Sequence, residues 1–170
     1  MARRKNSLKK TALMVGGFIL AVLVILGVVM GVSAWRERAS YVDPASLTTT
    51  VRIDGVDTTV SPYAVCEVGA PANDCDGSVF TTDLNSGETV TITVPEEVGD
   101  HDWSLLAIYD DPAKNDEHYF HSADPRDVEI PVKKDTAALM MVEVSSMQVQ
   151  RVDGTETPVV VTWSIADDQA

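Results

Sequence analysis

The sequence predicts an all-β protein: an immunoglobulin-like antiparallel β-sandwich that follows one N-terminal transmembrane helix. Three observations support this prediction. Residues 11–35 contain no charged side chain, which is typical of a membrane span. Apolar and polar residues alternate with period two through most of the remaining chain, and turn residues recur every 8–12 positions, as in sandwich domains. We therefore expect a basic cytoplasmic head (1–10), a transmembrane signal anchor (11–35), a linker (36–47) and an extracytoplasmic β-sandwich domain (48–168).

The uncharged run has the length and flanking charges of a retained anchor. As a helix, its 25 residues would be roughly 37 Å long, enough to cross a hydrocarbon core of about 30 Å. Five cations and no acid precede it: Arg3, Arg4, Lys5, Lys9 and Lys10. An excess of Lys and Arg marks the cytoplasmic side. The sequence thus predicts a single-pass cell-membrane protein with a cytoplasmic N-terminus and an extracytoplasmic C-terminal domain.

A cleaved signal peptide is the alternative interpretation of the same run. Val32, Ser33 and Ala34 would form a small-residue site with cleavage after Ala34. Signal peptides have apolar regions of only about 7–15 residues, and this run is much longer. The length therefore favours an anchor that stays attached.

Two glycines within the run are spaced for helix pairing. Gly27 and Gly31 form a G-x-x-x-G pair, which lets two membrane helices approach closely. We expect a homodimer through the span as one hypothesis. The alternative is that these glycines have no pairing role, because Gly is common in membrane helices.

The part beyond the span is strongly acidic. Residues 39–170 contain six basic and 25 acidic residues, a formal charge of −19. Such a charge repels phosphate backbones and anionic lipid headgroups, so nucleic acid is excluded as an expected partner. A well-hydrated surface accounts for the charge, and a basic partner would complement it.

The two cysteines are expected to form a disulfide. Cys66 and Cys75 lie nine positions apart in a segment rich in Gly, Pro, Asn and Asp, and an extracytoplasmic compartment keeps such a bond oxidised. A loop this short contributes roughly 2–3 kcal/mol in the chain-entropy model.

Nine segments of the outer part have strand character. Alternating or continuous apolar residues bounded by turn signals predict strands within Val51–Ile53, Tyr63–Val68, Val79–Thr82, Gly87–Pro95, Trp103–Asp110, His118–His121, Val128–Val132, Leu139–Val152 and Val159–Ile165. Asp54-Gly55 and Asp153-Gly154 have the composition of tight hairpin turns.

Three positions within these segments carry more specific predictions. Pro131 cannot donate a ladder hydrogen bond, which favours an edge strand. Trp103 opens a segment that is apolar on both faces and is expected to pack between the sheets. The apolar parity of the 139–152 segment changes near Ser145-Ser146, where we expect a β-bulge that keeps both halves facing the core.

Several of these residues resemble a known family. The relevant features are Pro62-Tyr63, the two cysteines, TVTITVP at 89–95, Trp103, MVEVSSM at 141–147 and Trp163. Together they resemble an uncharacterised domain family of membrane-anchored actinobacterial envelope proteins from mycolate-bearing genera. The resemblance implies a small anchored or exported envelope protein with a β-sandwich, and it implies no active site.

No motif in the sequence predicts catalysis, a cofactor or a metal centre. His118 and His121 are three apart, so on a strand they point to opposite faces. No nucleophile elbow or Gly-rich phosphate loop is present. Two acidic segments, Asp74–Gly77 and Asp110–Glu117, supply oxygen ligands without the full spacing of a calcium loop.

The expected function is therefore non-enzymatic. The sequence predicts a cell-envelope protein that presents an acidic immunoglobulin-like domain outside the membrane for contact with a protein or the cell wall. The alternatives are an accessory subunit of an envelope lipid or export transporter, and an extracytoplasmic ligand or ion receptor.

Overall fold

The computed structural model describes residues 24–31, 41–70, 75 and 77–169. The chain divides into two compact units, Met1–Tyr41 and Val42–Ala170. Residues 24–31 are helical, and within the described ranges no helix is both long and apolar enough to cross a membrane. The rest of the predicted span, the basic head and residues 36–40 of the linker lie outside the described residues.

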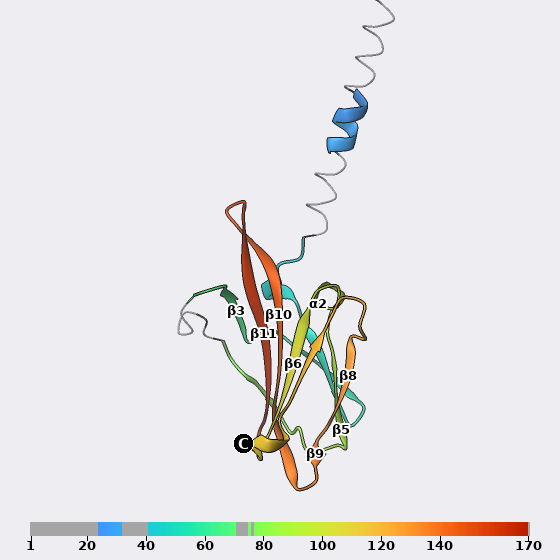
Figure 1. Ribbon diagram of the computed structural model, residues 1–170, viewed down its shortest axis with the longest axis vertical. Helices are drawn as coiled ribbons and strands as arrows, with labels where there is room; N and C mark the ends of the chain where they lie inside the picture. Colours follow the sequence, from blue (N-terminus) through green and yellow to red (C-terminus); the bar gives the residue numbers. More distant parts are fainter. Residues whose placement is uncertain (1–23, 32–40, 71–74, 76, 170) are drawn as a thin grey trace, which may run out of the picture. The chain divides into compact units, whose positions relative to one another are not determined.

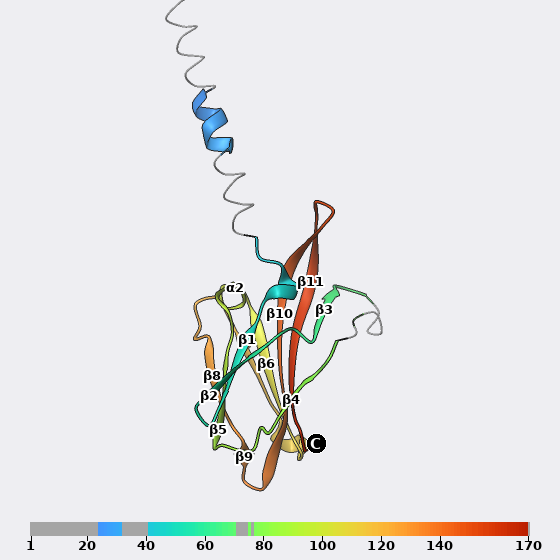
Figure 2. The ribbon, with the colours of Figure 1, turned by 180° about the vertical axis from the view of Figure 1, so that it is seen from behind.

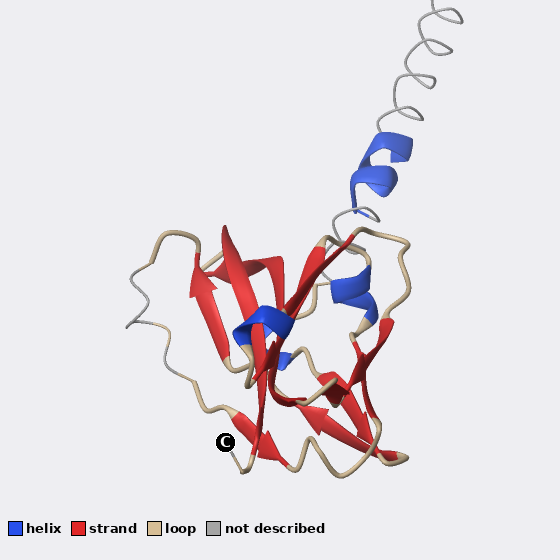
Figure 3. Ribbon diagram, turned by 60° about the horizontal axis from the view of Figure 1, so that its bottom comes forward, coloured by secondary structure: helices blue, strands red, loops and turns tan. Residues whose placement is uncertain are grey.

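The second unit consists mainly of strands (Figure 3). The strands are β1 (Thr49–Ile53), β2 (Val56–Val60), β3 (Ala64–Glu67), β4 (Phe80–Thr82), β5 (Thr89–Thr93), β6 (Trp103–Tyr109), β7 (Asp116–Phe120), β8 (Asp127–Pro131), β9 (Lys133–Lys134), β10 (Ala137–Val152) and β11 (Thr155–Asp167). Three short helices accompany them: η1 (Pro44–Ser46), α2 (Glu96–Gly99) and η3 (Pro112–Lys114).

These strands form two sheets that share one hydrophobic core (Figures 1 and 2). The smaller sheet has the order β2-β1-β5-β8. The larger has the order β3-β11-β10-β6-β7, with β4 beside β11 and β9 beside β10. Both sheets contribute buried side chains to the same cluster, for example Val90 and Ile92 from β5 and Leu105 and Trp163 from the larger sheet. The core therefore lies between the sheets.

The prediction of an all-β, antiparallel domain is confirmed. Among the described strands, β4 with β11 is the exception, because this pair is parallel. Each of the nine predicted segments contains a strand, and the prediction missed β2 and β9. The edge position inferred from Pro131 is also correct, since β8 forms one edge of the smaller sheet.

The predicted bulge lies at a different place in β10. The register is continuous through Ser145-Ser146, and the irregularity falls between Leu139 and Met141. Before the irregularity an odd-numbered residue, Leu139, is buried. After it the buried residues are even-numbered, as Val142 and Ser146 show. The prediction was wrong because it assumed that Met147 points inward, and the structure leaves Met147 58% exposed.

Two aromatic residues of β6 fix the packing of the core. Trp103 is 3% exposed and stacks on Phe120 of β7, with ring centroids 4.0 Å apart. Tyr109 donates a hydrogen bond from its hydroxyl to the Pro131 carbonyl, 2.7 Å away in the other sheet. Burial is the main cause that raises the pKa of Tyr109, so this hydroxyl stays protonated and links the two layers.

Candidate binding groove

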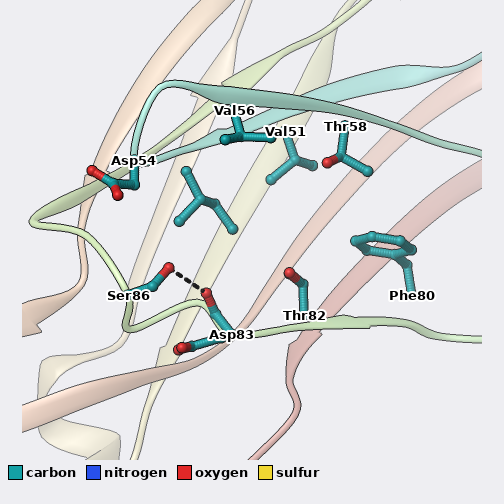
Figure 4. Close-up of a pocket in the computed structure, with 9 residues that line it drawn as sticks. Val51, Asp54, Val56, Thr58, Phe80, Thr82, Asp83 and Ser86 are labelled. Atoms are coloured by element: carbon teal, nitrogen blue, oxygen red, sulfur yellow. Dashed lines mark hydrogen bonds between the residues drawn. The ribbon is translucent and has the colours of Figure 1, made fainter.

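A groove of about 260 Å³ opens where β1 and β2 of the smaller sheet approach β4 of the larger one (Figure 4). Its lining is partly apolar and partly polar: Val51, Ile53, Asp54, Val56, Thr58, Phe80, Thr82, Asp83 and Ser86. We call this the β2–β4 groove. It joins strands from both sheets at one open side of the domain.

Alternation along the first hairpin decides which side chains reach the groove. Ile53 pairs with Val56 across the Asp54-Gly55 turn, whose φ angles of 49° and 76° are those of a tight hairpin. Since residues two apart share a face of a strand, Val56 and Thr58 lie on the same side of β2. Val56 is 65% exposed, so an apolar contact surface is open to a ligand.

The opposite wall comes from β4 and the loop that follows it. Phe80 packs partly against the core, and Thr82 precedes the turn at Asp83. Ser86 donates a hydrogen bond from its hydroxyl to the Asp83 carbonyl at 3.0 Å (Figure 4). This bond ties the loop into one compact wall.

The size of the groove limits what it can hold. Sites for drug-sized small molecules measure about 300–1,000 Å³, and this groove is smaller. A single apolar side chain presented by an extended peptide is a better match. The groove also carries two carboxylates, Asp54 and Asp83, and no Lys or Arg among the described residues that line it.

Asp83 also belongs to a group of three carboxylates at the end of β11. Oxygen atoms of Asp83, Asp167 and Asp168 lie within 4.8 Å of one another. Asp167 is buried and accepts a hydrogen bond from the Leu84 backbone N–H at 2.9 Å. Asp83 accepts one from Asn85 N–H at 3.1 Å. Both carboxylates therefore hold the loop after β4 in place.

The outer side of the first hairpin carries an ion pair. Arg52 donates from Nε to Asp57 at 2.5 Å. The hydrogen bond from Arg52 is the largest cause that holds the pKa of Asp57 below its usual value. Because both side chains are about half exposed, this pair stabilises the hairpin only weakly.

The predicted disulfide is present in the structure. Cys66 and Cys75 are bonded, with Cα atoms 5.4 Å apart. Cys66 lies in β3, which pairs with β11. The bond therefore ties the segment after β3 to the edge of the larger sheet.

Gly27 and Gly31 both lie in the helix of residues 24–31. A Cβ built at either position would meet no atom of the described residues within 4 Å. Pairing through the span stays a prediction.

The described acidic residues singled out in the sequence have hydrogen-bond or ion-pair partners within the protein. Asp111 caps η3 through the Ala113 N–H, and Asp110 accepts from Ala138 N–H. Asp116 pairs with Lys134, and Tyr119 donates to Glu117. The carboxylates at 74 and 76 lie outside the described residues.

The two neighbouring histidines have separate surroundings. The His118 ring lies 6.3 Å from that of Phe120. His121 Nδ1 is 3.2 Å from Asp102 Oδ1. The two rings therefore have different neighbours.

Comparison with known proteins finds one family model, described as a protein of unknown function (DUF2771), over residues 42–168. The chain belongs to the DUF2771 family. The match coincides with the whole β domain, including every residue that lines the β2–β4 groove. Searches among curated proteins and among solved structures gave no significant match.

Membership of DUF2771 confirms the resemblance to a domain family of unknown function. It carries no statement about genus or envelope association, so these stay predictions. Sequence reasoning did not find the groove, because its walls come from two segments separated by about twenty residues. The signal that could have found one wall is the alternation of Val56, Thr58 and Val60 directly after a hairpin turn.

Proposed function

We propose that this DUF2771 chain is a single-pass envelope protein whose immunoglobulin-like domain binds a short, basic segment of a partner protein in the β2–β4 groove. The observation that carries the proposal is the groove itself. It combines an open apolar wall at Val56 with two carboxylates at Asp54 and Asp83. An apolar anchor side chain flanked by Lys or Arg complements this lining in shape and in charge.

The topology supports the immunoglobulin-like assignment. Strand β5 pairs with β1 and β8, whereas the next strand, β6, belongs to the other sheet and pairs with β7 and β10. The chain thus crosses from the smaller sheet to the larger one between β5 and β6 and returns at β8, and the order β11-β10-β6 matches the G-F-C order of immunoglobulin-like sandwiches. In domains of this architecture, function resides in surface sites rather than in the fold.

The kinds of side chain that line the groove support a binding role rather than catalysis. The groove offers carboxylates and hydroxyls without a nucleophile and base in contact. The volume of this groove suits a single side chain better than a drug-sized ligand.

The membrane part of the proposal rests on the sequence. The uncharged run at 11–35 follows five cations, and this arrangement supports an extracytoplasmic β domain. A reporter fused after Ala170 that is active only in the cytosol would overturn this orientation.

The binding part is tested by photo-crosslinking of the full-length chain in cells. A photoreactive residue at Val56 should form an adduct with a partner protein, identified by mass spectrometry. The matched control is Glu129, an exposed position on β8 at the other edge of the same sheet. Equal yields at the two positions, or no adduct at Val56, would exclude the groove as the binding site.

Charge variants refine the same experiment. Asp54→Asn combined with Asp83→Asn should lower the adduct yield at Val56 several-fold, because the asparagine side chains keep their shape and lose their charge. An adduct with a large membrane transporter would assign the chain to the accessory-subunit alternative.

A further inference from the structure

The last two strands extend well beyond the rest of their sheet. Strand β6 pairs with β10 only up to Ser146, and β3 pairs with β11 only from Val159 onward. Beyond these points, β10 and β11 pair with each other as far as Val152 and Thr155. Residues 147–158 therefore form a two-stranded arm, which projects past the sheet in Figures 1 and 2.

One face of this arm is apolar near its base. Met147 lies opposite Val160, and Val149 lies opposite Pro158. Alternate residues of a strand share a face, so these four side chains lie together. Met147 is 58% and Val149 49% exposed, although apolar side chains of this size are normally buried.

The other exposed apolar residues gather at the same end. Of the eight large apolar side chains exposed between residues 42 and 169, five are found there: Val42, Val68, Met147, Val149 and Val152. Val68 donates a backbone hydrogen bond to the Pro158 carbonyl. Val42 precedes η1, which lies near the base of the arm in Figures 1 and 2. This clustering distinguishes the end from the rest of the surface.

Chain length limits how far this end can lie from a membrane that holds the proposed anchor. The predicted span ends at Trp35 and the domain begins at Val42. The six intervening residues reach at most roughly 20–22 Å when fully extended. The headgroup layer on each side of a bilayer adds only about 5–8 Å. A surface tethered this close to the bilayer has a high effective concentration there, so weak apolar contacts are enough to hold it against the lipid.

We propose that the apolar base of this face, formed by Met147, Val149 and Pro158 of the arm and the adjoining Val160, rests on the lipid surface of the anchoring membrane. The inference depends on the proposed anchor. It adds a second contact that sets how the domain stands on the membrane. This contact would be stabilised by burial of apolar side chains and not by electrostatic attraction. Toward the tip, the same face carries Arg151 and Glu156, which pair at 2.8 Å. With Asp153, the arm has no net positive charge for anionic lipids.

The test uses the full-length chain in phosphatidylcholine vesicles with quencher-labelled lipids. A fluorophore is attached to Thr155→Cys near the tip of the arm or, as a control, to Val56→Cys. Val56 is more exposed than Met147. It lies at the opposite end of β1 from η1, because β1 starts just after η1 and Val56 follows the turn at its other end. We expect lipid quenching at least twofold stronger at Thr155 than at Val56. Equal quenching would overturn the proposal.

Two further measurements separate the arm from the anchor. A fluorophore on Val24→Cys should be quenched strongly, and its failure would overturn the anchor and this inference together. If Val24 is quenched, Met147→Ser with Val149→Ser should reduce the quenching at Thr155 to the level at Val56, whereas Val79→Ser should not. Quenching that survives the double substitution, or appears only with anionic phosphatidylglycerol, would refute the apolar contact.

Discussion

Truncation of Trp103 to alanine tests the structural account of the core directly. The side chain is 3% exposed and stacks on Phe120 with an interplanar angle of 13°. A buried tryptophan removes about 150–250 Å² from water, worth roughly 4–6 kcal/mol at about 25 cal/mol per Å². Alanine keeps part of this burial, and the neighbouring edge strand β7 can relax. We therefore expect Trp103→Ala to lower the free energy of unfolding by about 3–5 kcal/mol.

The assay is equilibrium urea unfolding of the full-length chain in mild detergent, followed by far-ultraviolet circular dichroism. Trp103→Phe is the matched control and should cost only about 1–2 kcal/mol, because it keeps an aromatic ring. The buried indole Nε1 has no hydrogen-bond partner in the described part of the chain, so replacing the indole with a phenyl ring removes no hydrogen bond. The m-value should stay constant if only stability changes.

A double-mutant cycle isolates the stacking contribution. Trp103→Ala and Phe120→Ala should couple by about 0.5–1.5 kcal/mol, the usual strength of an aromatic pair. A decrease in the free energy of unfolding below about 1 kcal/mol for Trp103→Ala, or additive effects of the two substitutions, would refute this account of the core.

Three further predictions concern polar contacts. Tyr109→Phe should lower the free energy of unfolding by about 1–2 kcal/mol, because the Pro131 carbonyl loses its donor; an unchanged urea midpoint would contradict this. Asp167→Ala should cost roughly 1–3 kcal/mol and Asp167→Asn clearly less, since only asparagine can still accept from the backbone N–H; equal losses would count against this role. Hydrogen bonding to Lys134 lowers the pKa of Asp116, so its stabilising effect is present above the unfolded value of about 3.9 and lost as pH falls below it. The melting temperature should therefore decrease less between pH 6 and pH 2.5 for Lys134→Met than for the natural chain.

The strand pattern was predictable wherever local chemistry decides the structure. Asp54-Gly55 and Asp153-Gly154 both form turns with positive φ, because Asp and Gly tolerate that conformation better than other residues. Pro131 predicted an edge strand, because proline has no backbone N–H to donate to a neighbouring strand. These signals lie within a few residues of the structure that they predict.

Features that depend on tertiary contacts were missed or misplaced. Strand β2 was missed because four of its five residues are exposed and its central residues are polar. The bulge in β10 was misplaced because Met147 is apolar yet lies on the projecting arm. The β2–β4 groove and the Asp83–Asp167 proximity depend on which strand edges meet, and no local pattern determines this.

Strand β11 bonds to three others, namely β3, β4 and β10, and two of these lie in the first half of the chain. Contacts between residues so distant in sequence close large loops and slow the search for the native state. The larger sheet therefore cannot be completed until residues 155–167 have left the ribosome. We expect the domain to finish folding only after synthesis ends, and an incompletely folded chain is the form that a narrow translocation pore would accept.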